Sequence, residues 1–407
     1  MTTYPPLLSG LRVLDLSHQY AGALAGSLLG DLGADVVVVE HPTKRGSIRT
    51  MLPRRDAESM WWKVMARGKE TITLDLGSPE GRDLLLKMVG EFDVLIENFR
   101  PGTLEKWGLG PTDLEAAGAD LAMLRISGFG QTGPARNRPG FGSAAEAISG
   151  FAHLTGDPDG PPVFPSVTLA DGVTGVFGAF GLMAALASRR SGTPGPKVEV
   201  VDIALFESLF RIIPSQVAGY DQCGYVPKRP GNSLISHGSL RNLYTTSDGR
   251  HFIVASVGPQ TIRRIVQAVE APELAAEIDA GIAERTSEEF MGFLQRCDDA
   301  IRTFAEARPY ADVVAALTAH DAVFQAVYSM EDIVKDEQFH ARGDLIRVPD
   351  EDFGDILMQG IMPKFHSRDH EVTSAGKGRG RDNKAVYERL LGLTEADLER
   401  LSQDHVI

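Results

Sequence analysis

The chain has 407 residues, which is enough for two or three domains and a large apolar core. Its 41 Lys and Arg against 55 Asp and Glu give a formal net charge of −14, which disfavours nucleic acid or a membrane as the main partner, because both select clustered positive charge. The two cysteines, Cys223 and Cys297, lie outside any zinc-type or Cys-x-x-Cys spacing, so we expect no disulfide framework, no metal site and a cytoplasmic location.

Membrane contact is not expected from the apolar segments either. The N-terminus lacks the charged and apolar regions of a signal peptide, and the most apolar run, residues 173–186, is short and interrupted by glycine.

The first half of the chain alternates β-branched runs with small-residue or amphipathic stretches. We expect strands at residues 11–16, 35–40, 71–76, 93–97 and 121–127, with helices at 21–32 and after Ser78-Pro79-Glu80. Ser78 suits a helix N-cap and Pro79 the first helical position. This βαβ rhythm predicts an α/β fold with a Rossmann-like, doubly wound, mostly parallel sheet.

The pattern of predicted elements changes in the second half of the chain. A strand after residue 196 and an apolar helical stretch at 204–216 precede a hairpin signal, Asp248-Gly249, between residues 243–246 and 251–257. We therefore divide the chain into a large domain beginning at 1–200, a linker helix at 201–224, a smaller α+β domain at 225–330 and a C-terminal segment at 331–407. Thr394 is expected to cap a short helix over 395–401.

One glycine motif matches the dinucleotide-binding pattern but lacks the helix that should follow it. Residues 128–133 satisfy G-x-G-x-x-G after a strand, but the following residues 134–140 contain two prolines and cannot open the helix that would hold a pyrophosphate. A structural or substrate-covering loop is favoured here, and no tightly bound cofactor is expected.

Five cations follow the second strand directly, at the sheet edge where ligands of open α/β folds bind. Charge alone favours a solvated loop, yet on an acidic protein this is the best place for phosphates. The five are Lys44, Arg45, Arg49, Arg54 and Arg55.

Asp171 heads an apolar, glycine-rich run and has two interpretations. As a helix N-cap it would accept an orphan backbone N–H and suit the positive end of the helix dipole. As a nucleophile it would need no general base, because a carboxylate is ionised at neutral pH. Gly172 and Gly175 would let backbone N–H groups approach a developing oxyanion, while Gly172, Gly175, Gly178 and Gly181 would also favour tight helix packing.

These residues resemble the family III CoA-transferases, which include formyl-CoA transferase, carnitine CoA-transferase and α-methylacyl-CoA racemase. The likeness runs nearly end to end, and the stretch Glu97-Asn98-Phe99-Arg100-Pro101-Gly102 is highly specific. The other matching segments are residues 11–17, 32–40, 74–75, 78–81, 127–130, 155–156, 160–162, 170–171, 390–393 and 406–407.

The resemblance implies a CoA-transferase in which Asp171 forms an anhydride with the acyl group and then a thioester with CoA. It implies that CoA contacts fall on Leu74, Asn98, Phe99, Lys106 and Trp107, to which we add Arg49 from the cation cluster, and that His18 belongs to the acid site. The substrates would be an acyl-CoA and a carboxylic acid. The resemblance further implies an interlocked homodimer, or a heterodimer with a related chain.

Two alternatives stay open. An acyl-CoA racemase or epimerase of the same family would need a His where Phe141 stands, and Phe cannot exchange a proton. A non-catalytic CoA-binding subunit of a hetero-oligomer is the other alternative, which Asp171 argues against. Phe141 is placed at the acid site, and together with Met51 and Phe129 it favours a fairly apolar acceptor.

Overall fold

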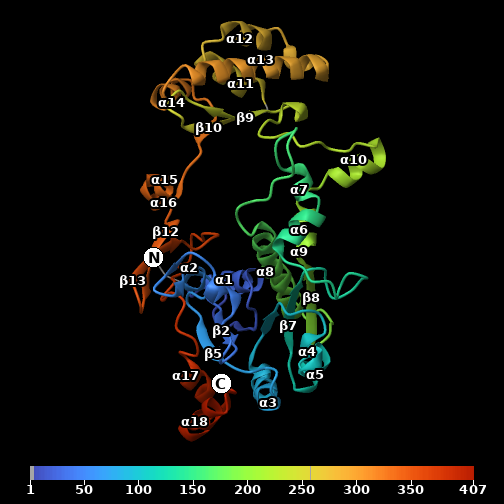
Figure 1. Ribbon diagram of the computed structural model, residues 1–407, viewed down its shortest axis with the longest axis vertical. Helices are drawn as coiled ribbons and strands as arrows, with labels where there is room; N and C mark the ends of the chain where they lie inside the picture. Colours follow the sequence, from blue (N-terminus) through green and yellow to red (C-terminus); the bar gives the residue numbers. More distant parts are fainter. Residues whose placement is uncertain (1–3, 257) are drawn as a thin grey trace. The chain divides into compact units, whose positions relative to one another are not determined.

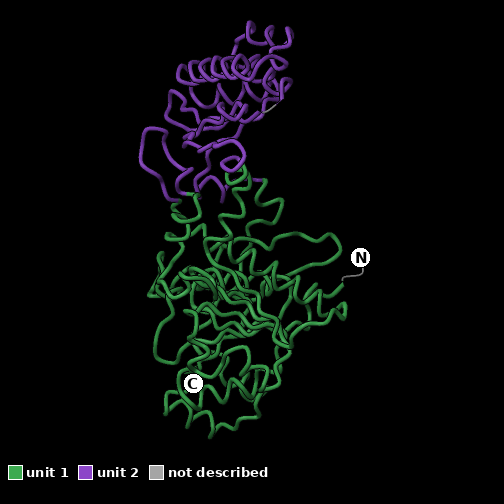
Figure 2. Tube along the Cα trace, turned by 90° about the vertical axis from the view of Figure 1, so that its right-hand side faces the viewer, with its two compact units in different colours: residues 1–151, 165–218, 338–407 green, residues 152–164, 219–337 purple. Residues whose placement is uncertain are grey.

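The computed structural model describes residues 4–256 and 258–407 and separates into two compact units (Figure 2). The first unit contains residues 1–151, 165–218 and 338–407, and the second contains 152–164 and 219–337. The fold is α/β, as the sequence predicts.

A six-stranded parallel sheet forms the centre of the first unit (Figure 1). Its spatial order is β5-β2-β1-β6-β7-β8, and every neighbouring pair is parallel. This is the doubly wound order, in which the direction of winding reverses between the first and fourth strands of the sheet, here β1 and β6. The strands are β1 (Arg12–Asp15), β2 (Asp35–Glu40), β5 (Glu70–Thr73), β6 (Val94–Glu97), β7 (Leu121–Ser127) and β8 (Val198–Ala204).

Alternate side chains of these strands fill two cores, because successive residues of a strand point to opposite faces. Val13 of β1 belongs to the core under α1 (Tyr20–Asp31) and α8 (Leu169–Arg190), whereas Leu14 belongs to the core under α3 (Pro79–Met88). Ser78 caps α3 as expected, since its side chain accepts a hydrogen bond from the Gly81 N–H. The remaining helices on this part of the chain are α2 (Met60–Met65), α4 (Thr103–Lys106), α5 (Pro111–Ala116), α6 (Gly142–Ile148) and α7 (Phe151–Leu154).

The segment expected to be a linker helix, residues 201–224, is not one helix. Its first residues complete strand β8, whose β-branched run pairs with β7. Helices α9 (Leu205–Arg211) and α10 (Gln216–Cys223) follow, and Pro214 lies between them, where a missing N–H and the ring sterics interrupt a helix.

The second unit has its own core and a small antiparallel sheet in the order β11-β10-β9. The expected hairpin is present: β9 (Leu240–Thr245) pairs with β10 (His251–Ser256) around Asp248-Gly249, and residue 257, the end of the expected run, lies outside the described residues. The other elements are β11 (Phe324–Ala326), α11 (Pro259–Ala268), α12 (Pro272–Asp279), α13 (Ser287–Glu306), α14 (Tyr310–Ala319) and α15 (Met330–Lys335).

The expected C-terminal segment, 331–407, belongs to the first unit from residue 338 onward, and it covers the outer edge of strand β5. Asp382 and Asn383 accept hydrogen bonds from the Thr71 and Thr73 N–H groups, which removes an edge that could pair with another chain. The segment contains α16 (Glu337–Ala341), β12 (Leu345–Asp350), β13 (Gly354–Gln359), α17 (Asn383–Leu391) and α18 (Glu395–Gln403). Thr394 caps α18, as the sequence predicts.

By length and composition, helix α8 is long and apolar enough to cross a bilayer, with a mean hydropathy of 1.6 over its most apolar 18 residues. In the structure its glycine face packs against other elements of the first unit. A Cβ added at Gly175 would lie 2.8 Å from the Ala21 carbonyl oxygen of α1, and one at Gly178 would lie 2.8 Å from the Leu124 side chain of β7. The glycine spacing therefore serves tight packing, as the sequence predicts.

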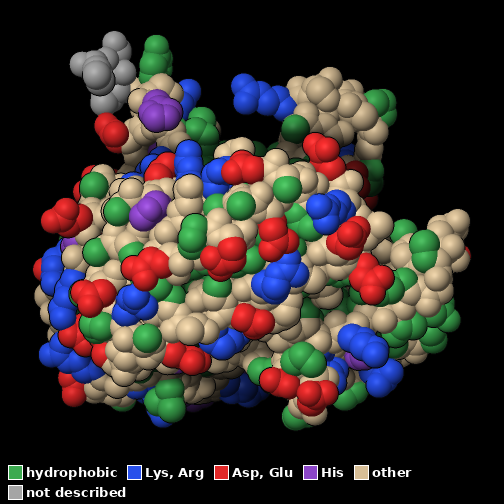
Figure 3. Space-filling view, turned by 90° about the horizontal axis from the view of Figure 1, so that it is seen from above, with side chains coloured by type: hydrophobic (Ala, Val, Ile, Leu, Met, Phe, Trp, Pro, Cys, Tyr) green, Lys and Arg blue, Asp and Glu red, His purple; other side chains and the backbone are tan. Residues whose placement is uncertain are grey.

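Charged side chains of both signs are intermixed on the face shown in Figure 3. Several ion pairs are instead buried, including Lys69 with Asp15 at 3.0 Å and Arg67 with Asp31. Among the described residues, no cluster of three or more His, Cys, Asp or Glu side chains could hold a metal ion.

The packing of α8 gives a first prediction. Gly175→Ala should lower the free energy of unfolding, although Ala is the better helix former by about 1 kcal/mol, because the new Cβ meets backbone that cannot move freely. Gly172→Ala in the same helix is the matched control, since its Cβ would meet only the Tyr20 ring at 3.6 Å. Urea unfolding of both variants measures the difference, and a Gly175→Ala variant as stable as the control would contradict the packing described here.

Candidate functional site

Two cavities lie at the carboxyl ends of the parallel strands, where ligands of open α/β sheets bind. The larger has a volume of about 600 Å³ and the smaller about 290 Å³. His18, Gln19 and Phe99 line both of them. His18 follows β1 and Phe99 follows β6, so the cavities meet at the point where the winding of the sheet reverses.

Asp171 lines the smaller cavity from the first turn of α8. It is not the N-cap, as one interpretation of the sequence held. Thr168 occupies the N-cap, and its hydroxyl has no partner among the described residues. The Asp171 carboxylate instead reaches over Gly142, the first residue of α6, where any Cβ would collide with Oδ2. Because glycine has no side chain, position 142 leaves room for the Asp171 carboxylate.

The surroundings of Asp171 favour its neutral form. Burial and, to a smaller extent, the nearby carboxylate of Glu146 raise the pKa of Asp171 to about 6, against the effect of the Asp171 N–H, which lowers it. Glu146 lies on α6, is 2 % exposed, and accepts a hydrogen bond from the Ala170 N–H at 3.4 Å. At neutral pH Asp171 is therefore largely ionised but poorly solvated, which suits a nucleophile.

The glycines after Asp171 do not supply free backbone donors, contrary to the sequence-based expectation. The Gly172 N–H is bonded to the Thr168 carbonyl within the helix, at 3.0 Å. Other donors are available in the same cavity. Asn98 and Ser127 line it, and the buried Asn98 Nδ2 and Ser127 hydroxyl have no partner among residues 4–256 and 258–407.

An aromatic row connects the two cavities. The ring of His18 lies edge-on to Phe99 with centroids 4.5 Å apart, and Phe99 lies edge-on to Trp107 at 5.2 Å. Burial lowers the pKa of His18, which keeps its imidazole neutral at neutral pH. Asn98 fixes the turn after β1 by accepting a hydrogen bond from the His18 N–H at 3.1 Å.

The larger cavity holds apolar and cationic groups suited to a long phosphorylated ligand. Leu74 and Trp107 line it, as do Lys44 and Arg45, which form no ion pair within the described part of the chain. Arg49 also lines the cavity, but its guanidinium binds both oxygens of Glu40 at 2.6 and 2.7 Å and lies over the Trp62 ring. Arg49 thus has a structural partner, which Lys44 and Arg45 lack.

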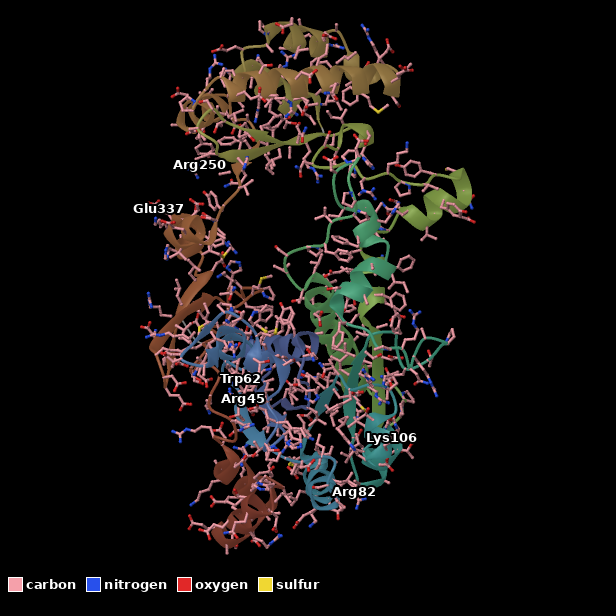
Figure 4. The ribbon with its side chains drawn as sticks, in the orientation of Figure 1. Arg45, Trp62, Arg82, Lys106, Arg250 and Glu337 are labelled. Carbon is pink, nitrogen blue, oxygen red and sulfur yellow. The ribbon has the colours of Figure 1, made fainter. Side chains whose placement is uncertain are left out.

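Lys106 is the predicted CoA contact that lines neither cavity. It is exposed at the end of α4, and Figure 4 shows it on the opposite side of the unit from Arg45 and Trp62. The other predicted site residues are brought together: Leu74, Arg49 and Trp107 line the larger cavity, Asn98, Phe141 and Asp171 the smaller, and His18 and Phe99 both.

Sequence reasoning missed Glu146, Ser127 and three arginines of the smaller cavity, Arg100, Arg136 and Arg138. Their position in the chain could have indicated them, because Ser127 ends β7 and the loop at 128–141 must leave the sheet at the same edge. Met51 and Phe129, taken as signs of an apolar acceptor, line neither cavity. Phe141, the third residue behind that expectation, does line the smaller cavity, so the expectation of a fairly apolar acceptor stays a prediction.

Comparisons with known proteins agree with the fold and identify the family. The model of CoA-transferase family III matches residues 8–383. The chain is 35% identical to the succinyl-CoA–D-citramalate CoA-transferase of Chloroflexus aurantiacus, covering 99% of this chain and 98% of that one. It is 33% identical to the succinyl-CoA–L-malate CoA-transferase beta subunit of the same organism, over 100% and 99% of the two chains.

A solved structure is similar over nearly the whole chain. The CAIB/BAIF family protein from Brucella suis superposes with a TM-score of 0.80 at 29% identity, over 95% of this chain and 100% of that one. Together, the doubly wound α/β fold and the matched family model define an enzyme that transfers CoA. The chain belongs to the family III CoA-transferases.

The buried charge of Asp171 has a consequence for stability. Above its raised pKa of about 6 the native state holds an ionised carboxylate at a cost, and below about pH 4 the cost vanishes because the carboxyl is protonated in both states. We expect Asp171→Asn to raise the free energy of unfolding by up to about 3 kcal/mol at pH 7.5, and to gain little at pH 4.

Urea unfolding at the two pH values measures this effect. Asp202→Asn is the matched control, because Asp202 is exposed and accepts hydrogen bonds from the Gln131 N–H; it should show no such gain. Equal stability of Asp171→Asn and the parent protein at pH 7.5 would contradict the desolvation of Asp171.

Proposed function

We propose that this chain transfers CoA from succinyl-CoA to a dicarboxylic acid, with Asp171 as the covalent nucleophile. The observation that carries the proposal is the position of Asp171: a desolvated carboxylate in a small cavity that joins a larger one at His18, Gln19 and Phe99. The substrate class is supported by the relatives, whose names specify succinyl-CoA with citramalate or malate.

In the first half of the reaction, the Asp171 carboxylate attacks the thioester carbonyl. The carbon–sulfur bond breaks, the CoA thiolate leaves with the electron pair, and a mixed anhydride joins Asp171 to the acyl group. The thiolate then attacks the aspartyl carbonyl, which releases succinate and leaves CoA as a thioester on Asp171. One oxygen of the released succinate comes from the enzyme.

The second half runs the same two steps in reverse order. The acceptor carboxylate attacks the aspartyl thioester, forming a second anhydride and releasing the CoA thiolate. The thiolate then attacks the acceptor carbonyl of that anhydride, so that the new acyl-CoA leaves and Asp171 returns as a carboxylate. No proton, electron or further reagent is needed in either half.

Asn98 and Ser127 supply the donors for the oxyanions that form in these steps. Both line the cavity of Asp171, and the Asn98 Nδ2 and Ser127 Oγ lack partners among the residues that the structure describes. Donors that have no partner stabilise a developing charge without first breaking another hydrogen bond.

The larger cavity binds the CoA portion. Trp107 and Phe99 offer aromatic surfaces. Lys44 and Arg45, which form no ion pair with the described residues, offer cations for the phosphates. The thioester then lies at the junction with the smaller cavity, beside His18.

Two alternatives are separated from this proposal by solution experiments. A racemase or epimerase would incorporate solvent deuterium at the α-carbon without an acid acceptor, and Phe141 in the cavity of Asp171 offers no second acid or base. A CoA-binding subunit of a hetero-oligomer would not transfer CoA as a purified single chain.

Isotope exchange tests the covalent role of Asp171. The purified chain should exchange labelled succinate into succinyl-CoA without a third substrate, because the acyl group leaves and returns through the enzyme. We expect Asp171→Asn to reduce the exchange rate by about a thousandfold or more, while the exposed control Asp202→Asn keeps it. Exchange that survives in Asp171→Asn would exclude the proposed nucleophile.

The raised pKa also predicts a pH profile. Because only the carboxylate attacks, kcat/KM for succinyl-CoA should fall about tenfold per unit as the pH drops below 6. Glu146→Gln keeps the acceptor for the Ala170 N–H but removes a charge that raises the pKa of Asp171. Its profile should therefore fall at a lower pH, and an unshifted profile would show that another group controls the reaction.

We also propose that the chain works as a dimer, as the resemblance implies. Helix α8 carries an exposed apolar stripe of Val176, Phe180 and Met183, of which Phe180 is 69% exposed. Light scattering should give twice the chain mass, and Phe180→Glu should lower it; a monomer that transfers CoA at full rate would refute the dimer.

A further inference from the structure

Three arginines line the cavity of Asp171: Arg100 follows β6, and Arg136 and Arg138 lie on the loop at 128–141. None of them forms an ion pair with a carboxylate in the described ranges 4–256 and 258–407. Of the described residues that line this cavity, Asp171 alone carries a carboxylate. The wall is therefore cationic, in a protein with a net charge of −14.

The neighbouring Arg125 shows the contrast. It extends from β7, and its guanidinium binds Glu97 at 2.7 Å and Glu105 at 2.7 Å. Its charge is therefore already paired with carboxylates of the protein. Arg138 has a different environment: its guanidinium lies over the Phe129 ring, 5.2 Å from the centroid. It forms no ion pair within the described part of the chain, so its donors can bind a ligand.

We propose that Arg136 and Arg138 bind the carboxylate of the substrate that does not react. This inference rests on the proposed function, since a dicarboxylic acid must place one carboxylate at Asp171 and the other elsewhere. A guanidinium fork binds a carboxylate through two parallel hydrogen bonds, which fixes its orientation. Phe141 lines the same cavity and provides an apolar wall for the carbon chain between the two carboxylates.

The same pair of arginines serves donor and acceptor in turn. Both acyl groups form an anhydride with the same aspartate, so each occupies the small cavity while the other is absent. The cavity volume of about 290 Å³ accommodates a small acid. Selection for a distal carboxylate should therefore be equal in the two half-reactions, which a separate acceptor site would not produce.

Selectivity between diacids and monoacids tests the inference. The ratio of kcat/KM for succinate over propionate as acceptor, and for succinyl-CoA over propionyl-CoA as donor, is measured for Arg136→Met, Arg138→Met and the double variant. We expect each single variant to lower both ratios about tenfold and the double variant to lower them further. The lower ratios should come from a lower kcat/KM for succinate and succinyl-CoA, mainly through a higher KM, while the values for propionate and propionyl-CoA stay unchanged.

Two controls keep the outcome clear. Arg138→Lys retains the charge but not the fork and should recover part of the ratio. Arg190→Met, at the exposed end of α8 outside both cavities, should leave both ratios unchanged. All variants should unfold at the same urea concentration as the parent chain, because both loop arginines are exposed.

The inference is overturned if both ratios stay unchanged in the double variant, or if only one half-reaction responds. Such a result leaves the proposed function standing when the parent chain still exchanges succinate and Asp171→Asn does not. Failure of the proposed function looks different: the parent chain would exchange no acid, or Asp171→Asn would retain exchange.

Discussion

The close approach of helix α8 to α1 and the central sheet is the constraint on which the site depends. Gly175 and Gly178 allow this approach, since a Cβ at either position would meet Ala21 or Leu124 at 2.8 Å. Because α8 connects β7 to β8, its first turn must lie at the carboxyl ends of the strands. The packing of glycines thus determines where Asp171 is, and its burial there determines how Asp171 behaves.

The loops around Asp171 are held by buried charge pairs beneath the cavities. Glu97 binds Arg125 and accepts a hydrogen bond from the Phe99 N–H at 2.7 Å, and Asp15 accepts from Ser17 N–H at 3.0 Å and pairs with Lys69. These contacts fix the turns that carry Phe99 and His18, so the aromatic row between the two cavities is set before any ligand binds. A preformed row of this kind reduces the entropy lost on binding.

The arrangement of the sheet could be predicted from the sequence, because β-branched runs separated by helical stretches specify parallel strands and short right-handed connections. Residues 35–40 and 121–127 are strands with the predicted bounds. A strand after residue 196 and a helical stretch from 204 were also predicted, but the linker helix assigned to 201–224 overlapped this strand, because its pairing with β7 is not visible in the sequence.

The site was predictable only in part, for the same reason. Residues directly after strands, such as His18 and Phe99, follow from topology, whereas contacts across the fold do not. The collision of a Cβ at Gly142 with Asp171, the buried Glu146 on α6 and the cationic wall of Arg136 and Arg138 all depend on how α6 and the preceding loop pack. Sequence spacing also favoured Asp171 as a cap, while the structure places Thr168 there.

Oxygen transfer from substrate to enzyme tests the role of Asp171 most directly. The chain is incubated with succinyl-CoA and succinate labelled with oxygen-18 in its carboxylates, and the peptide that contains Asp171 is weighed by mass spectrometry. If Asp171 forms both anhydrides, one labelled oxygen enters its carboxylate per transfer, and repeated turnover replaces both oxygens. An unlabelled Asp171 after many turnovers, or label on Glu146 in its place, would contradict the proposed mechanism.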